Sequence, residues 1–159
     1  MKFWIAFINS IKLPNRQAIF ALNRISMDIA VLYLFILLLI VSAPSLADQL
    51  TDPGTGMHWL LLLIYFFIFY YLPLNMVVLL LVSLMAYIGA GIAKLLKRKI
   101  RFSILWKLVV YMTTIPFLLY TIIALFFPIG DVLTGLFILY TFIFMIKVII
   151  AFPKRKRRK

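Results

Sequence analysis

The sequence predicts an all-α, polytopic membrane protein, and two observations carry that prediction. The chain has 159 residues, of which 66% are hydrophobic, whereas a soluble domain contains roughly 45–50%. The apolar residues also form long runs, and a helix needs about 20 such residues to cross a bilayer. Together these features exclude a soluble enzyme and a soluble nucleic-acid-binding protein.

The distribution of charge predicts how the chain crosses the membrane. Four of the 17 lysines and arginines precede the first long apolar run, six fall between Lys94 and Lys107, and six consecutive bases end the chain. Elsewhere the only base is Lys147, and the loops at Ser45–Met57 and Phe127–Asp131 carry acidic charge alone. Because short loops rich in lysine and arginine stay in the cytoplasm, we expect both termini on the cytoplasmic side.

Hydropathy and charge together predict four transmembrane helices. They form a single membrane domain over residues 1–153, which a basic cytoplasmic tail follows at residues 154–159. Each apolar run reaches the roughly 17–25 residues that a bilayer crossing requires. The predicted spans cover residues 27–43, 58–93, 104–126 and 132–152.

The second span is too long for a simple crossing. At about 1.5 Å per residue, this segment would reach about 54 Å, against about 30 Å for the hydrocarbon core. Pro73 divides it, so the segment is either one long helix kinked at Pro73 or two spans joined by a turn at residues 72–75. Proline is tolerated in membrane helices, and an extra crossing would break the charge pattern. We therefore favour the kinked helix.

The N-terminal segment, residues 1–13, predicts an amphipathic helix that lies in the cytoplasmic interface. Its apolar residues recur at helical spacing on one side, and lysine, asparagine and serine occupy the other. A helix of this kind buries its apolar side at the level of the lipid head groups. Pro14 ends the segment, and Asn15 is suited to cap the helix that follows.

Small residues line one side of the second span near its cytoplasmic end. Glycine and alanine spaced four residues apart let two helix backbones approach closely. This small-residue strip predicts tight helix packing, either inside the protein's own bundle or against another membrane protein. Its members are Ser83, Ala86, Gly89, Ala90 and Ala93.

Two prolines inside the spans have polar neighbours. Asn75 follows Pro73, and Thr113 and Thr114 precede Pro116. Because proline removes a backbone donor, nearby amide and hydroxyl groups can satisfy the carbonyls that it leaves free. We expect a bend at each proline, with these side chains bonded to the backbone.

Residues with the chemistry of catalysis or metal binding are scarce. The chain has no cysteine and no glutamate, and no acidic residue lies within a helical turn of its one histidine, His58. Asp48 and Asp52 precede His58 without the spacing of a ligand set. No span carries a charge at its centre, where ion and proton pathways hold theirs. The sequence therefore predicts a non-enzymatic protein with no catalytic residue, cofactor or metal.

The central basic loop predicts contact with anionic lipid. Each lysine or arginine near an anionic leaflet contributes about 1 kcal/mol of attraction. In a membrane protein this accounts for the basic charge without nucleic acid as a partner. The residues expected to contact lipid are Lys94, Lys97, Arg98, Lys99, Arg101 and Lys107.

Several runs of the chain carry a family resemblance. They are Leu81–Gly91, Lys94–Phe102, Leu105–Lys107 and Tyr111–Pro116, joined by Ser10 and Pro14 in the N-terminal segment. These runs resemble an uncharacterised family of integral membrane proteins of Gram-positive bacteria, related to the Yip1-like superfamily and often labelled maltodextrin-utilisation membrane protein. The resemblance implies a bacterial plasma-membrane location and no enzymatic site. Members of that family often hold a sizeable external domain after the first span, where this chain has only a short loop.

These features lead to three functional hypotheses. The leading one is an accessory or regulatory subunit that docks with another membrane protein, or with a second copy, through the small-residue strip. The second, which the Yip1-like resemblance implies, is a lipid-handling or membrane-organising protein that binds anionic lipid at the central basic loop. The third is a small transporter component that uses Asn75, Thr113 and Thr114 around the two proline bends.

Overall fold

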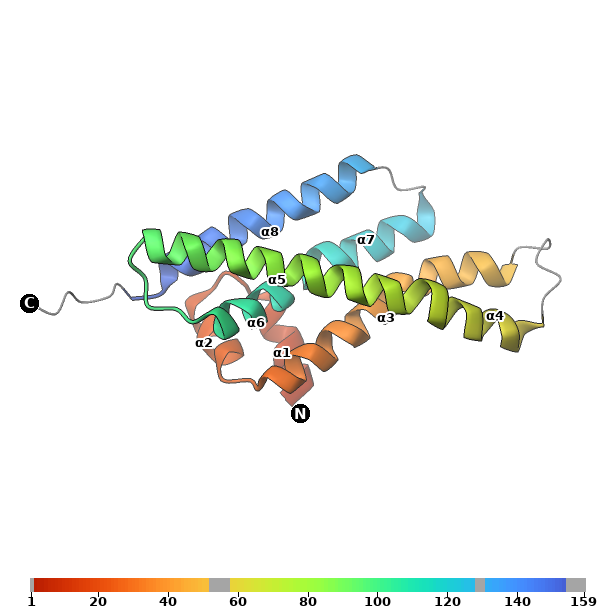
Figure 1. Ribbon diagram of the computed structural model, residues 1–159, viewed down its shortest axis with the longest axis horizontal. Coiled ribbons are helices and arrows are strands. Elements are labelled where there is room, and N and C mark those ends of the chain that lie inside the picture. The colour runs from red at the N-terminus through yellow and green to blue at the C-terminus, as the bar shows by residue number, and fades with distance from the viewer. Residues whose placement is uncertain (1, 52–57, 128–130, 154–159) are drawn as a thin grey trace, which may run out of the picture.

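Helices account for every regular element in the computed structural model, which describes residues 2–51, 58–127 and 131–153. The prediction of an all-α chain is therefore confirmed for this part of the protein. Long helices run side by side along the bundle, and two short N-terminal helices gather on one flank (Figure 1). The elements are α1 (Lys2–Ile11), α2 (Arg16–Asn23), α3 (Met27–Thr51), α4 (Trp59–Phe66), the π-helical segment η1 (Phe67–Tyr71), α5 (Leu72–Leu95), α6 (Phe102–Met112), α7 (Thr114–Phe126) and α8 (Asp131–Ala151).

Three helical runs are long and apolar enough to cross a membrane: Met27–Thr51, Trp59–Leu95 and Phe102–Phe126. The chain is thus compatible with a multi-pass membrane protein. In α8 a further apolar stretch, Gly135–Ala151, is shorter than these three. The first run continues past residue 43, where the predicted span ended, because α3 accommodates Pro44 inside the helix.

The segment that follows residue 58 is one continuous helical run from Trp59 to Leu95, with no turn at residues 72–75. Directly before Pro73 it widens into η1, where the N–H of Leu72 bonds to the carbonyl of Phe67, five residues earlier. The Asn75 side chain donates to the carbonyl of Tyr71 at 2.7 Å. The polar neighbour of Pro73 is therefore bonded to the backbone of its own helix.

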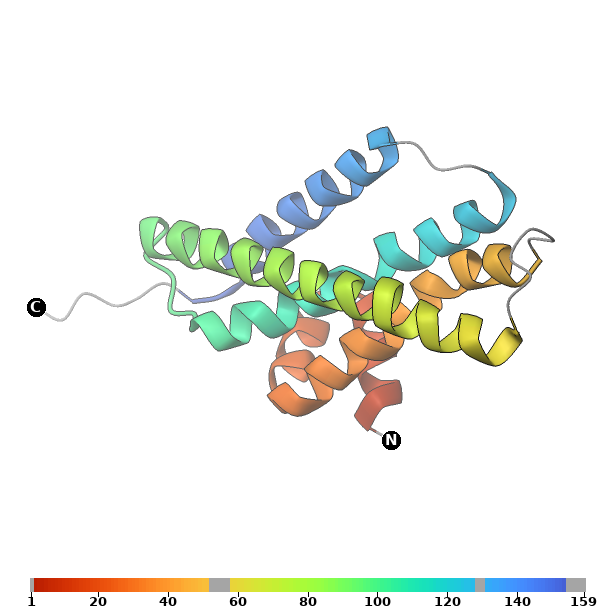
Figure 2. The same ribbon diagram turned by 45° about the vertical axis from the view of Figure 1, so that its right-hand side comes forward.

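The interior of the bundle is centred on α6. All residues from Leu105 to Met112 are buried, because α6 is surrounded by α5, α3, α8 and the two N-terminal helices. In both views the C-terminal end of α8 lies close to α5, and α8 diverges from α5 toward the N-terminal end of α8 (Figure 1, Figure 2). The bundle is consequently tight at one end and open at the other.

The run Phe102–Phe126 is interrupted at Thr113, which separates α6 from α7. The Thr113 hydroxyl donates to the carbonyl of Val110 at 2.7 Å, and the Thr114 hydroxyl donates to that of Tyr111 at 2.8 Å. Pro116 follows in the first turn of α7. Threonine hydroxyls thus satisfy the carbonyls at a helix break that the sequence places beside this proline.

The N-terminal helix α1 packs into the bundle in an unexpected orientation. The side of α1 that carries small residues faces inward: Ala6 and Ser10 are buried, and the Ser10 hydroxyl donates to the Ala6 carbonyl. The apolar residues Trp4, Ile5 and Ile11 are exposed. Lipid tails surround such a surface as readily as protein does, so α1 need not bury its large apolar residues against its neighbours.

Candidate functional site

Acidic residues and histidine do not gather into a metal site in the described ranges. No three histidine, aspartate or glutamate residues lie close enough there to share a metal ion. His58 caps the start of α4 through its side chain, which accepts from the N–H of Leu60. Asp52, named with it in the sequence, lies outside the described residues, as does the basic tail at residues 154–159.

The small-residue strip is occupied inside the chain. Ala86, Gly89 and Ala93 are buried, and a side chain added at Gly89 would lie 2.5 Å from Leu105 Cδ2 and 2.6 Å from Met145 Sδ. Ser83 accepts a hydrogen bond from the indole N–H of Trp106 at 3.1 Å. These contacts come from α6 and α8, so this part of the strip packs within the bundle, while Ala90 is half-buried.

Lys107 is held inside the bundle rather than displayed to lipid. Its side chain is 9% exposed, and its ammonium donates to the carbonyls of Asn23 at 2.8 Å and Ile25 at 2.6 Å. These carbonyls lie at the C-terminal end of α2, where the helix dipole favours a positive charge. Lys107 therefore fastens the end of α2 and the turn before α3 to α6, and its ammonium is not placed as the prediction of lipid contact expected.

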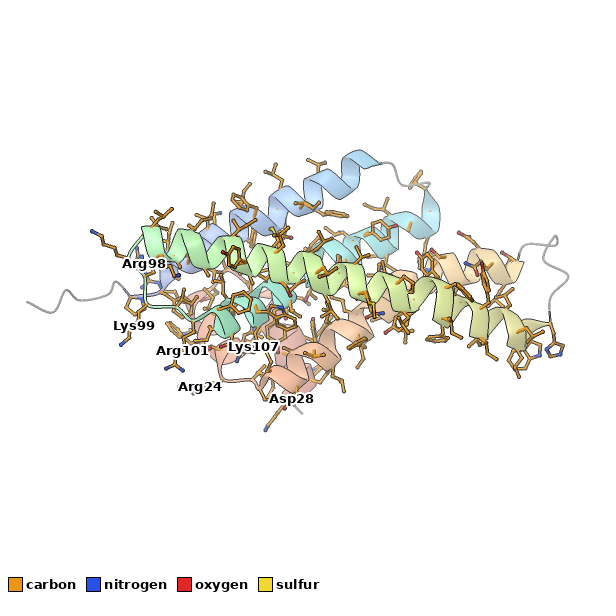
Figure 3. The ribbon with its side chains drawn as sticks, in the orientation of Figure 1. Arg24, Asp28, Arg98, Lys99, Arg101 and Lys107 are labelled. Carbon is orange, nitrogen blue, oxygen red and sulfur yellow. The ribbon has the colours of Figure 1, made fainter. Side chains whose placement is uncertain are left out.

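The loop between α5 and α6 contacts the residues that follow α8 at one end of the bundle. The Arg98 guanidinium donates to the carbonyl of Phe152 at 2.6 Å, and the backbone N–H of Lys99 donates to that of Pro153 at 3.2 Å. The sequence continues from Pro153 directly into six bases. Figure 3 shows Arg98, Lys99 and Arg101 together where α5 passes into α6. We call this end of the bundle the basic corner.

The exposed members of the basic corner are Lys94, Lys97, Lys99 and Arg101, whereas Arg98 is half-buried beneath them. Lys97 adopts a left-handed conformation with φ of 52°. Two hydrogen bonds close the end of α5 around it, from the N–H of Arg98 to the carbonyl of Ala93 and from the N–H of Lys97 to that of Lys94. This arrangement is a Schellman motif, and it turns the chain so that Arg98 reaches α8.

A cluster of hydroxyl groups lies where α1, α3 and the α6–α7 break meet. The hydroxyls of Tyr33 and Thr114 are 2.8 Å apart and hydrogen-bonded. The rings of Phe3 and Tyr111 both lie 5.2 Å from the ring of Tyr33. The Tyr111 hydroxyl is buried and has no hydrogen-bond partner among the described residues. The sequence did not single out the tyrosines, because tyrosine is common in membrane helices at positions with no such role.

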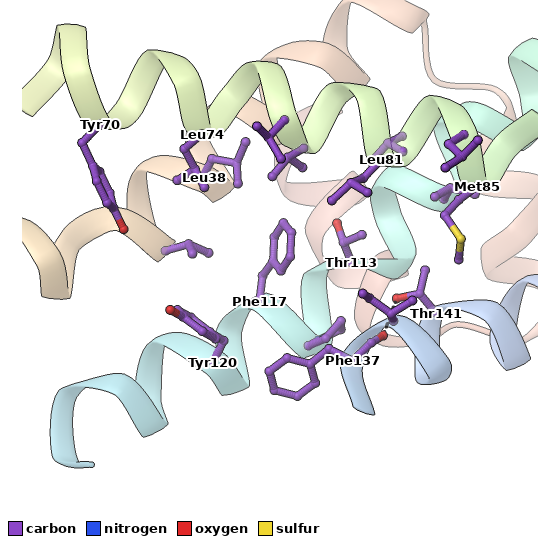
Figure 4. Close-up of a pocket in the computed structure, with 18 residues that line it drawn as sticks. Leu38, Tyr70, Leu74, Leu81, Met85, Thr113, Phe117, Tyr120, Phe137 and Thr141 are labelled. Carbon is purple, nitrogen blue, oxygen red and sulfur yellow. Dashed lines mark hydrogen bonds between the residues drawn. The ribbon is translucent and has the colours of Figure 1, made fainter. Parts of the chain in front are cut away.

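An apolar cleft opens where α8 diverges from α5. It has a volume of about 440 Å³, and α3, η1, α5, α6, α7 and α8 all contribute to its walls (Figure 4). None of the described residues that line it is charged. The polar side chains among them are the hydroxyls of Tyr70, Thr113, Tyr120 and Thr141. Sequence reasoning missed this cleft, since its lining residues come from six elements and share no spacing.

Comparison with known proteins gives no match: no family model, no curated protein and no solved structure is significantly similar to the chain. The resemblance to the family related to the Yip1-like superfamily therefore stays a prediction.

Proposed function

We propose that this chain is a non-enzymatic, multi-pass protein of the bacterial plasma membrane that binds anionic lipid at its basic corner and thereby takes part in lipid handling or membrane organisation. The observation that carries the proposal is the pair of bonds from Arg98 to Phe152 and from Lys99 to Pro153. They bring the central basic loop beside the point from which the six C-terminal bases continue.

The charge gathered at the basic corner requires a counter-surface. Like charges at one place repel one another unless anions are near. The described aspartates are Asp28, Asp48 and Asp131, and none lies on the loop between α5 and α6 or at the end of α8. An anionic leaflet supplies the missing charge, and each base near it contributes about 1 kcal/mol of attraction. Lipid head groups are thus the partner that this end of the bundle fits.

The membrane placement that goes with this function has four spans and both termini in the cytoplasm. It rests on the three long apolar helices, on α8 as the fourth apolar helix and on the positive-inside pattern. We further propose a bend in the second span at Pro73, which η1 supports because π-helical segments and prolines are both causes of helix bending.

A role as an accessory or regulatory subunit is the weaker proposal, since the small-residue strip that favoured it is filled by α6 and α8. A transporter role is weaker for a similar reason. Asn75, Thr113 and Thr114 each donate to a carbonyl of their own helix, so these donors are engaged before any substrate arrives.

The proposal is tested with purified protein in vesicles of phosphatidylcholine, with and without phosphatidylglycerol and cardiolipin, followed by gentle extraction and native mass spectrometry. We expect the anionic lipids to be retained preferentially. Replacing Lys97, Lys99 and Arg101 with glutamine should lower retention about tenfold or more, because three contributions of about 1 kcal/mol are lost.

The matched control changes the same number of exposed bases in the N-terminal segment, at Lys2, Lys12 and Arg16. Retention should fall much less in that variant. Equal losses in the two variants would show that only net charge matters and would overturn the basic corner as a site. A second protein recovered in stoichiometric amount before purification would instead favour the accessory role.

A further inference from the structure

The apolar cleft has the chemistry of a site for hydrocarbon with one polar attachment point. Three of its four hydroxyls are already engaged. Tyr70 bonds with Ser45, Thr113 donates to the carbonyl of Val110, and Thr141 donates to that of Phe137. The Tyr120 hydroxyl has no hydrogen-bond partner among the residues drawn in Figure 4. A ligand therefore meets apolar walls and one hydroxyl, that of Tyr120, which is not bonded to another residue drawn there.

The length of the cleft suits an extended hydrocarbon chain. Its lining on the long helix extends from Tyr70 to Met85, which is roughly 22 Å at 1.5 Å per residue. A hydrocarbon chain can lie along apolar walls of that length without any polar partner, except at the end where it joins its head group.

The stretches of this sequence that lie outside the described residues are unsuited to fill the cleft. The longest stretches outside the described residues are 52–57, which holds aspartate, proline and two glycines, and 154–159, which is entirely basic. Burying charge in an uncharged apolar site is strongly unfavourable. The occupant therefore comes from the surroundings, which in a membrane are lipid chains.

The two ends of the cleft differ, and this difference orients the ligand. Tyr120 lies six residues before the end of α7 at Phe126, roughly 9 Å along the helix. Tyr70 and Tyr120 flank this end of the cleft (Figure 4), and tyrosines with a polar tip favour the level of the lipid head groups. Met85 lines the opposite end, on the side of the basic corner.

We propose that the cleft binds one acyl chain of a glycerolipid from the leaflet opposite the basic corner. The ester carbonyl accepts a hydrogen bond from the Tyr120 hydroxyl, and the methyl end lies near Met85. This inference goes beyond the head-group binding proposed above, because it concerns the other end of the molecule and does not require an anionic lipid.

The test uses the full chain in vesicles of neutral phosphatidylcholine that contain a trace of phosphatidylcholine with a photoactivatable diazirine on one acyl chain. One probe carries the diazirine close to the ester, and the other carries it close to the methyl end. After photolysis the labelled residues are identified by proteolysis and mass spectrometry. The near-ester probe should label the Tyr70–Tyr120 end, and the near-methyl probe should label residues 82–85.

Two matched variants separate the cleft from the outer surface of the same helix. Leu81 lines the cleft and is 47% exposed, whereas its neighbour Leu80 is 71% exposed and does not line it. Leu81→Trp should reduce labelling in the cleft about tenfold, because the indole fills the space for the chain. Leu80→Trp should leave it unchanged. Tyr120→Phe keeps the shape but removes the donor, so lipid retention should fall about fivefold.

Each result decides the proposal. The predicted order of labelling, lost in Leu81→Trp and kept in Leu80→Trp, supports an acyl-chain site. Reversed labelling by the two probes overturns the orientation, and unchanged retention in Tyr120→Phe overturns the role of its hydroxyl. Labelling that is equal on both faces of α5 overturns the site itself. None of these outcomes depends on the basic corner, whose variants are read with anionic lipid.

Discussion

Helices α6 and α7 are consecutive parts of one apolar run, yet their surroundings differ sharply. Of the eleven residues in α6, eight are buried, whereas α7 buries only three of its thirteen, Thr114, Pro116 and Thr121. Hydrophobicity does not explain the contrast, because both helices are strongly apolar. In a membrane, lipid is as apolar as leucine, so the hydrophobic effect does not drive helices together there.

What differs is the chemistry of the neighbours. Gly89 lets Leu105 of α6 approach the backbone of α5. Trp106 donates to Ser83, and Lys107 donates to two carbonyls at the end of α2. Small residues and polar contacts are what bring membrane helices close. Among the described residues no hydrogen bond joins α7 to α5 or α8, and there α8 leaves α5 and the apolar cleft opens.

The largest effect should come from Gly89→Leu, which disturbs the closely packed half of the bundle around α6. A side chain at this position meets Leu105 and Met145, so we expect a loss of about 3 kcal/mol in the free energy of unfolding. Gly135→Leu is the control in the open half, because nothing lies within 4 Å of its added carbon. Unfolding by dodecyl sulfate titration in mild detergent measures both, and equal losses would remove the contrast between the halves.

Lys107→Met should have the next largest effect. The methionine keeps the apolar stem but leaves the carbonyls of Asn23 and Ile25 without their charged donor, at a cost of about 2 kcal/mol. Hydrogen exchange should rise in α2 and the first turn of α3, while the exchange of α7 stays as it was. Lys99→Met, at an exposed position, should change neither. An unchanged α2 in Lys107→Met would contradict the fastening role.

Tyr33→Phe tests the boundary between the two halves. It removes the hydrogen bond to Thr114 at the α6–α7 break, and we expect a loss of about 1 kcal/mol, near the upper range for such bonds in membranes. The control is Tyr87→Phe, whose side chain is 72% exposed. Thermal unfolding followed by circular dichroism suffices for this comparison. A Tyr33 variant as stable as the Tyr87 variant would show that the break is held by packing alone.

The smallest effect, and the only stabilising one, is expected for Lys97→Gly. A left-handed residue favours glycine, and Lys97 has φ of 52°, so the substitution should add about 0.5 kcal/mol to the free energy of unfolding. Lys94→Gly removes the same charge inside the last turn of α5 and should destabilise by about 1 kcal/mol. If Lys97→Gly and Lys94→Gly both destabilise the protein, the left-handed conformation of Lys97 does not lower the free energy of unfolding.

Local sequence patterns predicted much of the fold. Hydrophobic runs are a property of neighbouring residues, so the all-helical fold and the three long apolar helices followed from them. The bonds from Thr113 and Thr114 to the backbone likewise depend only on residues one turn away. The sequence predicted a bend at Pro116, whereas the helix is interrupted at Thr113. Asn75 made the kind of backbone bond that its place after Pro73 suggested.

The candidate sites were harder to predict because they depend on which helices meet. The small-residue strip predicts close packing but cannot say whether the partner is α6 or another protein, since both give the same spacing. The charge of Lys107 suggested lipid, and only the position of the α2 carbonyls shows otherwise. The contact of Arg98 with Phe152 joins residues 54 positions apart, and the cleft draws on six elements with no shared motif.

The bond from Lys107 to the end of α2 also has a consequence for biogenesis. It joins positions 84 and 82 residues apart, and a ribosome delivers the N-terminal part of a chain first. The α2 segment therefore leaves the ribosome long before its lysine is made. The α2 segment is thus synthesised early but is fixed in the bundle late, only after Lys107 has been added. Nascent chains that stop short of residue 107 should therefore leave α2 accessible to protease.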